Sequence, residues 1–597
     1  MRAPHKAGYK TGAVLAITGM ILSGFSGVAY ADESPAAQRN TNGADHRAAG
    51  RFDMPLDGFS PANTRLVEGN PRAVGIHDTS TIDAAWDQVE AYANPTDAGT
   101  RPMYASAVGL MAHQGRIVGK HASGFSRLYA DGDGTKLPAD EQIAATEDTI
   151  YDLASVTKLF TSLLVMQQVE QGHLDLDQPY AAYVHDFGNN GKQEITLRQM
   201  LTHTSGLKPW LPLWSAYDTK AERIQAVMET TPDDEPGTAY TYSDLNLIAL
   251  GVLVEQVTGQ RLDEALTTGI TGPLGLTDTG YNPPASKLHR IAATEYQEAA
   301  GRGMVWGEVH DENAWSLGGI AGHAGIFSTA GDMAVLAQTL LNGGVYQGVR
   351  ILEQSTVEQL LQNENEEFPG NAHGLGFELN QMWYMGGLSN PSAAGHTGYT
   401  GTSIVIDYAS RSFAILLTNR VHPSRTWGSN NPARRVVADG LAGALAVNPQ
   451  KGPTAWFGGA ANSSEATLQT SVTVPDEAEL TFDVFADNET TDVFALETST
   501  DGGQTWDLLP FAVTGPEGTE QTDGTYNNHG ERTWGKATAT LPVGEHLIRW
   551  RYTTDGNTLG RGIFVDNIQV HDGNRTILNG ERNADAFEAD GFSLVRR

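Results

Sequence analysis

Apolar residues recur at helical spacing through the first three quarters of the chain. Residues 81–93 place Ile82, Trp86 and Val89 on one side of a helix. Two longer apolar helices are expected to end at the glycines Gly172 and Gly259. The pattern therefore predicts these helices: 81–93, 157–172, 245–259 and 330–344.

Strand patterns lie on either side of these helices. Residues 104–124 predict a hairpin that turns at the segment HQGR, and residues 402–419 predict two adjacent strands. Strands at both ends with helices between them indicate an α/β domain whose sheet joins its two ends.

The pattern changes after about residue 447. A linker rich in Gly, Pro and Ser leads into short alternating strands separated by turn signals such as DGGQTW. Strands at this density without helices predict a β-sandwich. The strand patterns cover residues 480–486, 493–499, 546–554 and 562–570.

The first 31 residues have the order of a secretory signal. Basic residues precede an apolar run at residues 12–29, and Ala29-Tyr30-Ala31 provides a small-residue cleavage site. A membrane anchor is the alternative, but the run is short and rich in glycine. The predicted organisation is a Sec-type signal peptide (1–31), a flexible leader (32–69), an α/β domain (70–447), and a linker with a sandwich domain (448–597).

Composition narrows the chemistry. The 597 residues carry a formal net charge of −32, which disfavours nucleic acid as a partner and favours solubility. Without cysteine, disulfides, thiolate catalysis and cysteine-ligated metals are excluded. The predicted location is secreted or associated with the cell envelope.

The stretch YDLASVTKLFT contains Ser155 and Lys158, three residues apart. On a helix, such positions lie about 5–6 Å apart at Cβ, so a lysine can accept the proton of a serine hydroxyl. Burial would favour the neutral amine that this role needs. Alone, the S-x-x-K spacing is also typical of an ordinary solvated helix face.

Two further motifs follow in order. Tyr242-Ser243-Asp244 precedes a helix, and His396-Thr397-Gly398 leads into a strand. With these three motifs, the chain resembles the penicillin-recognising serine hydrolases: class C β-lactamases, D,D-carboxypeptidases and related esterases. The segments ITLRQMLTHTSGL and GGIAGHAGIFSTAGDMAVLAQ extend the resemblance over roughly residues 70–447.

The resemblance implies a fold and roles for individual residues. The fold is an antiparallel sheet flanked by helices, with an all-helical subdomain. Ser155 attacks a carbonyl carbon, Lys158 accepts or shuttles its proton, and Tyr242 serves as second acid and base. The N–H groups of Ser155 and Tyr399 form the oxyanion hole. Thr397 and Gly398 contact substrate, and His396 tunes the tyrosine or meets a substrate carboxylate.

Two residues depart from the family pattern. Asp244 stands where asparagine is frequent. Its charge near Lys158 would favour the lysine ammonium and make the lysine a poorer base, so Tyr242 would take more of the role of general base. His396 stands where lysine is frequent and is mostly uncharged at neutral pH, so it would hold a carboxylate less firmly. β-Lactams and peptide termini carry that carboxylate, whereas many esters and amides do not.

Metal sites are weaker candidates. His203, His310 and His323, with Asp311 and Glu312, offer ligand types for zinc, but their spacing fits no helical metal motif. We expect His203 to pack a loop, and His310 or His323 to line a pocket near a glycine-rich loop at residues 318–325. The segment ADGDGTK starts like a calcium loop but lacks its final glutamate, so a hairpin turn is expected. No cofactor is predicted.

The C-terminal region resembles the jelly-roll appendages of secreted bacterial hydrolases. Trp506, Trp534 and Trp550 suggest a carbohydrate platform or, alternatively, a filled sandwich core. Calcium at Asp566 and association with the cell wall are further hypotheses.

The prediction is an exported serine hydrolase that forms an acyl-enzyme on Ser155. Its substrate is a small-molecule or peptide ester or amide, handled as by an esterase, a D,D-peptidase or a β-lactamase. The alternative is a catalytically inactive penicillin-binding-like or envelope-binding protein. The natural substrate and the oligomeric state stay open.

Overall fold

The computed structural model describes residues 45–56, 58–95, 100–459, 461–573 and 575–596. The predicted signal peptide, residues 1–31, lies outside the described residues. In the part of the chain that is described, no helix combines the length and apolar character needed to cross a membrane.

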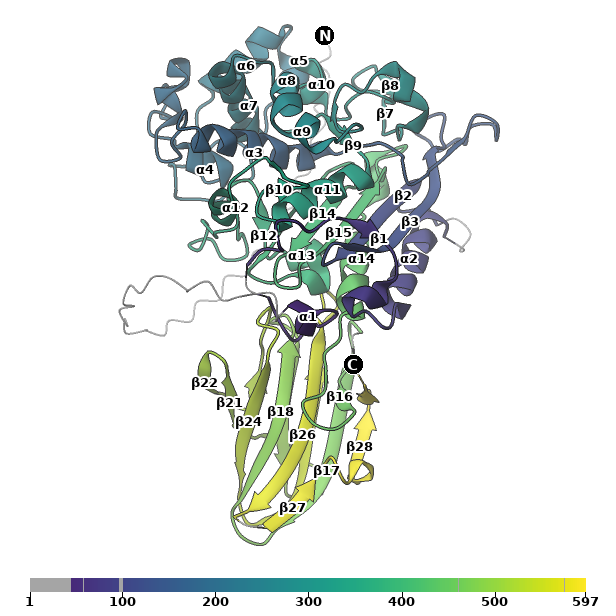
Figure 1. The fold of residues 1–597 in the computed structure, drawn as a ribbon, viewed down its shortest axis with the longest axis vertical. Coiled ribbons are helices and arrows are strands. Elements are labelled where there is room, and N and C mark those ends of the chain that lie inside the picture. Colours follow the sequence, from purple (N-terminus) through teal and green to yellow (C-terminus); the bar gives the residue numbers. More distant parts are fainter. Residues whose placement is uncertain (1–44, 57, 96–99, 460, 574, 597) are drawn as a thin grey trace, which may run out of the picture. The chain divides into compact units, whose positions relative to one another are not determined.

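An eight-stranded sheet forms the centre of the α/β region (Figure 1). Its order is β1-β3-β2-β15-β14-β13-β12, with β4 beside β3, and only the β1–β3 pairing is parallel. The predicted hairpin and the predicted strand pair at residues 402–419 are confirmed. The strands are β1 (Val67–Glu68), β2 (Ser106–His113), β3 (Arg116–Arg127), β4 (Ile143–Ala144), β12 (Glu378–Leu379), β13 (Ala393–Thr397), β14 (Ser403–Asp407) and β15 (Ser412–Thr418).

The sheet is buried on both faces because its central strands are apolar at successive positions. In β14, Ile404 and Ile406 join one core while Val405 joins the other, as the two-residue period of a strand requires. Helix α11 (Ala330–Leu341) packs on the first face, and α2 (Ser80–Ala93) and α14 (Asn431–Ala444) pack on the second.

A group of helices extends the first core. Helices α3 (Thr157–Glu170) and α7 (Asp244–Thr258) pack together, and almost every side chain of α3 is buried. Gly259 ends α7 in the left-handed conformation at φ 67°, as the sequence predicts. The other helices here are α4 (Leu197–Leu201), α5 (Leu213–Ala216), α6 (Lys220–Glu229), α8 (Leu262–Leu266), α9 (Gly272–Leu274), α10 (Glu312–Ser316) and α12 (Gln354–Leu360).

A small three-stranded sheet joins these helices to the sequence motifs. Its order is β5-β9-β6, and β5 ends just before Ser155. The strands are β5 (Tyr151–Asp152), β6 (Gly280–Tyr281) and β9 (Ile326–Ser328). The remaining short elements of the region are α1 (Asp45–Ala48), α13 (Met382–Met385), β7 (Tyr296–Gln297), β8 (Gly303–Met304), β10 (Val345–Tyr346) and β11 (Val349–Arg350).

The C-terminal strands form two sheets around their own core, so the predicted β-sandwich is confirmed. One sheet contains β16 (Ala455–Phe457), β18 (Ala478–Asp487), β21 (Ala512–Gly515), β22 (Gly518–Gln521), β24 (Trp534–Leu541), β26 (Gly562–Asp572), β27 (Arg575–Asn579) and β29 (Ser593–Val595). The other contains β17 (Glu465–Val474), β19 (Val493–Ser499), β20 (Asp507–Leu508), β23 (Thr525–Tyr526), β25 (Gly544–Thr553) and β28 (Phe587–Asp590).

Part of the segment expected to be a flexible leader is folded. Phe52 is 1% exposed, and β1 extends the large sheet through Val67 and Glu68. Asp53 accepts a hydrogen bond from Trp534 Nε1 of the sandwich at 3.2 Å. The expectation for residues 45–69 was wrong, because a polar and irregular composition does not reveal that single apolar side chains are buried.

The sandwich is also joined to the α/β region by a buried ion pair. Arg532 Nη1 donates to Asp407 Oδ2 at 2.6 Å, and both side chains are at most 1% exposed. Arg532 also donates to the carbonyl of Leu388 and lies 4.1 Å from the centre of the Phe52 ring. The sandwich therefore contacts the α/β region directly, in addition to being connected to it by the linker.

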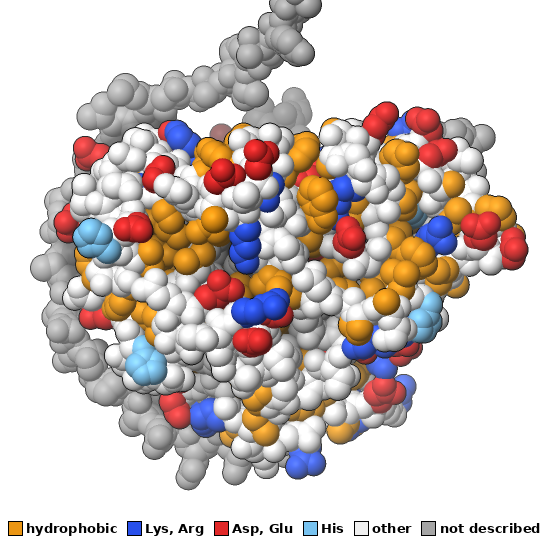
Figure 2. Space-filling view, turned by 90° about the horizontal axis from the view of Figure 1, so that it is seen from above, with side chains coloured by type: hydrophobic (Ala, Val, Ile, Leu, Met, Phe, Trp, Pro, Cys, Tyr) orange, Lys and Arg blue, Asp and Glu red, His pale blue; other side chains and the backbone are white. Residues whose placement is uncertain are grey.

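On the face drawn in Figure 2, acidic and basic side chains are interspersed, and hydrophobic side chains form patches between them.

Candidate active site

Ser155 stands at the tip of a strained turn between β5 and α3. Ala154, the residue before it, has φ 47°, a conformation that costs a residue with a side chain about 1–3 kcal/mol. Asp152 holds the turn: its Oδ1 accepts from the N–H of Ala154 at 2.8 Å, and its Oδ2 accepts from the N–H of His310 at 2.6 Å. The buried carboxylate thus fixes the backbone that presents Ser155.

Lys158 lies one helical turn after Ser155, as the S-x-x-K spacing predicts. Its Nζ donates to Ser155 Oγ at 3.1 Å and to the carbonyl of His323 at 3.3 Å. The side chain is 1% exposed. The alternative of a solvated helix face is therefore wrong.

Tyr242 comes from a distant part of the sequence and meets the same two residues. Its ring centre lies 4.8 Å from Lys158 Nζ, and both Lys158 and Ser155 interact with its hydroxyl. His203 positions it: the His203 carbonyl accepts from Thr241 N at 2.8 Å, and His203 Nδ1 accepts from Ser243 N at 3.1 Å.

The rings of His203 and Tyr242 pack at 4.6 Å. Burial, with the nearby Lys158 ammonium, holds the pKa of His203 well below its usual value, so the imidazole is neutral. The predicted packing role of His203 is confirmed, and its function is to fix the segment that carries Tyr242.

Asp244 forms an ion pair with Lys158, whose Nζ lies 2.8 Å from Asp244 Oδ1. Burial works against the lysine ammonium, but the Asp244 charge, with the hydrogen bonds to Asp244 and Tyr242, outweighs it, so the pKa of Lys158 is raised. The amine is therefore charged at neutral pH, contrary to the neutral base that burial alone would give. The pKa of the Tyr242 phenol is also raised, chiefly by burial, although Lys158 opposes this.

His396 and Thr397 end β13 beside this group. His396 is 1% exposed, and its Nδ1 lies 2.7 Å from the carbonyl of Thr397, which fixes the proton on Nδ1. Burial and the nearby Lys158 lower the pKa of His396 to about 3. A neutral imidazole cannot attract a substrate carboxylate by charge, which disfavours the second predicted role of His396. The first role, tuning Tyr242, agrees with the geometry, because the centres of the two rings lie 6.1 Å apart.

Gly398 is required by a close approach between two segments. A Cβ at this position would lie 2.1 Å from Thr402 Oγ1 and 2.3 Å from the carbonyl of Leu153. The hydroxyls of Thr400 and Thr402 donate to the carbonyls of Asp152 and Leu153 at 2.6 and 2.9 Å. The turn after β13 is thereby tied to the segment that presents Ser155.

The N–H groups of Ser155 and Tyr399 are free to bind an oxygen. Within the described residues, no group accepts a hydrogen bond from either of them. Ser155, Tyr399 and Tyr242 all line one cavity of about 350 Å³. This is the arrangement that an oxyanion hole beside a nucleophile requires.

The cavity also contains residues that the sequence did not single out. Glu378, Trp383, Arg420 and Arg434 line it together with the three motifs. Burial raises the pKa of Glu378 to about 7. These residues belong to no motif in the sequence. The one available signal was that Arg420 directly follows the predicted strands of residues 402–419.

The expectation that His310 or His323 lines the pocket was wrong: neither is among the residues that line the cavity. His323 Nε2 lies 2.9 Å from Asp311 Oδ1, and His310 Nε2 lies 2.9 Å from Glu295 Oε2. The carbonyl of His323 binds Lys158, so the glycine-rich segment does support the site. Pairing with a carboxylate accounts for both imidazoles without a metal.

The acidic clusters are explained by hydrogen bonds. Glu489, Asp492 and Asp555 of the sandwich are the one described group of acids and histidines close enough to hold a metal, but Asp492 accepts from Asp555 N and Tyr552, and Glu489 accepts from Thr558. Asp131 accepts from the N–H groups of Asp133 and Thr135, so its segment is the predicted turn.

The sandwich residues proposed for ligands are mostly structural. Trp550 is fully buried in the sandwich core, and Trp534 packs on Phe485 beside Asp53. Asp566 accepts from the N–H groups of Gln450 and Lys451 in the linker. The hypothesis of a tryptophan platform is therefore wrong for Trp534 and Trp550.

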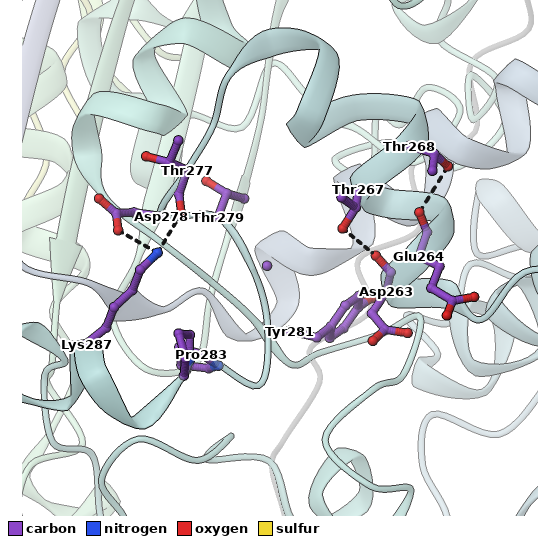
Figure 3. Close-up of a pocket in the computed structure, with 12 residues that line it drawn as sticks. Asp263, Glu264, Thr267, Thr268, Thr277, Asp278, Thr279, Tyr281, Pro283 and Lys287 are labelled. Atoms are coloured by element: carbon purple, nitrogen blue, oxygen red, sulfur yellow. Dashed lines mark hydrogen bonds and ion pairs between the residues drawn. The ribbon is translucent and has the colours of Figure 1, made fainter.

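A second cavity, of about 380 Å³, lies among α8, β6 and the segment after it (Figure 3). Lys287 binds Asp278 and the carbonyl of Thr277 there, and Tyr281 reaches the glycine-rich segment through the carbonyl of Ala321. None of the residues of the three motifs lines it. The larger cavity is thus separate from the candidate chemistry.

Comparison with known proteins agrees with this geometry. The Beta-lactamase family model matches residues 93–439, more than half of the chain. The chain belongs to the Beta-lactamase family. This match includes all three motifs and lies within the region that the sequence assigned to the resemblance.

Two curated relatives carry the same name. A protein of Escherichia coli O157:H7, named "Putative D-alanyl-D-alanine carboxypeptidase", is 35% identical over 400 residues, which are 62% of this chain and 88% of the relative. A protein of Salmonella agona (strain SL483) with the same name is 34% identical over 402 residues, 62% of this chain and 89% of the relative.

Among solved structures, a penicillin-binding protein homologue from Caulobacter crescentus is 20% identical with a TM-score of 0.48. It covers 62% of this chain, which in turn spans 97% of that structure. A family VIII carboxylesterase is also 20% identical, with a TM-score of 0.46 and coverages of 62% and 97%.

Proposed function

We propose that the chain is an exported serine hydrolase that cleaves peptides ending in D-alanyl-D-alanine through an acyl-enzyme on Ser155. The observation that carries the proposal is that Ser155 and Tyr242 line one cavity beside two unpaired N–H groups, with the buried Lys158 in contact with both. The relatives named for D-alanyl-D-alanine cleavage support the substrate class. The order of the N-terminal residues supports export.

The proposed acylation transfers one proton through Tyr242. Ser155 Oγ attacks the carbonyl carbon of the scissile amide while its proton passes to Tyr242 in its phenolate form, the ionised form that the neighbouring Lys158 ammonium favours. The N–H groups of Ser155 and Tyr399 hold the oxygen that becomes negative. When the C–N bond breaks, the tyrosine proton goes to the departing nitrogen, which leaves as a free amine. Tyr242 is then again without its proton, as at the start of the step.

Deacylation repeats the sequence with water. Tyr242 accepts a proton from water as the hydroxyl attacks the ester carbon, and the proton then returns to Ser155 Oγ. Lys158 stays an ammonium throughout, paired to Asp244, and its charge favours negative charge on Tyr242 and on Ser155. Because the Asp244 carboxylate keeps Lys158 charged, Tyr242 carries the proton and Lys158 supplies only a positive charge.

A terminal carboxylate needs a cation that His396 does not supply. Arg420 lines the cavity, and the described acids form no ion pair with it, so it is the candidate partner together with the hydroxyl of Thr397. The neutral His396 favours a second candidate function, hydrolysis of esters without a carboxylate. The inactive alternative is disfavoured because the hydroxyl, amine and phenol are all retained in contact.

The test compares three substrates with one variant. Purified protein and Ser155→Ala are incubated with a peptide ending in D-alanyl-D-alanine, a series of p-nitrophenyl esters and a labelled penicillin. The proposal expects release of D-alanine by the wild type and none by the variant. Ester cleavage without D-alanine release would replace it with the esterase function, and equal behaviour of both proteins would refute both.

A further inference from the structure

The peptide unit that joins Gly398 to Tyr399 decides where the N–H of Tyr399 points. In a trans peptide the C=O and the N–H point in opposite directions. The carbonyl of Gly398 accepts from Arg434 Nη2 at 2.7 Å and from Gly401 N at 2.9 Å. The N–H of Tyr399 is therefore directed away from Arg434, and no group of the described chain accepts its hydrogen bond.

Arg434 reaches this peptide from the first turns of α14. The same Nη2 donates to the carbonyl of Thr402 at 3.1 Å, and Nη1 donates to Asn431 Oδ1 at 2.8 Å. Gly398 and Thr402 are the two ends of the turn between β13 and β14, and they also bond to each other. One planar guanidinium thus holds both ends of the turn that carries Tyr399, a task suited to its fixed fork of donors.

The guanidinium is a buried cation without a carboxylate partner. Arg434 is 7% exposed, and none of the described acids forms an ion pair with it. Burial lowers its pKa to about 10, so the charge persists at neutral pH. A charged donor on the Gly398 carbonyl polarises the peptide and makes the Tyr399 N–H a stronger donor.

We propose that Arg434 is the positioning residue of the oxyanion hole: it fixes the orientation of the Gly398–Tyr399 peptide and strengthens its N–H. The inference rests on the proposed function, because the Tyr399 N–H matters only if an oxyanion forms beside Ser155. Arg434 lines the cavity, but its hydrogen bonds go to Gly398, Thr402 and Asn431 and not to Ser155 or Tyr242. Its effect is expected when the tetrahedral intermediate forms, not when substrate binds.

The test uses Arg434→Met, which keeps the length of the side chain but removes the charge and the donors, and Arg434→Lys, which keeps the charge but not the fork. Arg350→Met is the matched control, because Arg350 also donates to two turn carbonyls, those of Gly343 and Leu352, and does not line the cavity. The substrate is whichever ester or peptide the wild type turns over. Active sites are counted by irreversible labelling with a fluorophosphonate.

The expected result is a fall in kcat of about 10²-fold per labelled site in Arg434→Met, as for loss of one oxyanion donor, with KM changed less than about threefold. Affinity for a boronic acid, which forms a tetrahedral adduct with the serine, should fall by a similar factor. Arg434→Lys should recover part of both losses, and Arg350→Met should change neither.

Two results would overturn the inference. One is a kcat per labelled site in Arg434→Met within about threefold of the wild type. The other is a loss of activity that follows only the loss of folded protein, with boronate affinity unchanged. A wild-type protein that turns over no substrate would refute the proposed function instead.

Discussion

Lys158 Nζ lies 2.8 Å from Asp244 Oδ1, and this ion pair determines how the site handles protons. The carboxylate raises the pKa of Lys158 and also opposes ionisation of Tyr242. Under the proposed mechanism, proton transfer through the tyrosine therefore improves as the pH rises.

Replacing Asp244 with Asn should shift the pH dependence of kcat/KM. Removing the negative charge lowers the pKa values of both Lys158 and Tyr242, so the rise in activity should move to lower pH by about one unit. The profile is measured with one substrate over pH 5 to 10. Asp218→Asn, at an exposed position, should leave it unchanged. An unshifted or opposite profile in Asp244→Asn would place proton transfer elsewhere.

Tyr242→Phe should lose most of the turnover and keep the fold. Loss of a positioned acid and base reduces kcat by about 10²–10⁴-fold, whereas the ring still packs on His203. Turnover and the melting temperature are measured side by side, with Tyr217→Phe at an exposed tyrosine as the control. Activity near that of the wild type would assign the proton to another group.

Glu378→Gln should change how stability depends on pH. The pKa of Glu378 is about 7 in the folded chain and about 4.5 when unfolded, so the folded state holds the proton between these values. Stability of the wild type should then fall as pH rises from about 4.5 to 7. The Gln variant lacks this loss. The melting temperature of the variant minus that of the wild type should therefore be larger at pH 8 than at pH 5.

The control for this measurement is Glu366→Gln, at an exposed carboxylate. A difference between Glu378→Gln and wild type that stays constant from pH 5 to 8 would show that Glu378 is ionised in both states.

Arg532→Met should destabilise the whole chain. The substitution leaves Asp407 buried without its cation, which costs about 3–5 kcal/mol for a buried pair. Urea unfolding measures the loss, and adding Asp407→Asn to the variant should recover part of it. A loss below about 1 kcal/mol would show that the sandwich is held independently of this pair.

The local parts of the site could be predicted from the sequence. Ser155 and Lys158 are three residues apart on a helix, so their contact follows from helical geometry alone. The role of Asp244 as a partner of the lysine charge also followed from its sequence motif. The helices ending at Gly172 and Gly259 and the strands of residues 402–419 were given by hydrophobic period and glycine placement.

The long-range parts could not be predicted. Arg434 reaches Gly398 across 36 residues, and Arg532 reaches Asp407 across 125, with no spacing rule that connects them. Phe52 fills a core in a segment whose polar composition indicates a flexible leader. Trp534 and Trp550 could stack on sugar or fill a core, and only tertiary burial decides between these alternatives.

The most direct test of the account is mass spectrometry of the protein quenched during turnover of the best ester or peptide substrate. The account predicts one acyl group per molecule, located by peptide mapping on the segment that contains Ser155, and no adduct in Ser155→Ala. An adduct on another segment, or one that persists in Ser155→Ala, would contradict it.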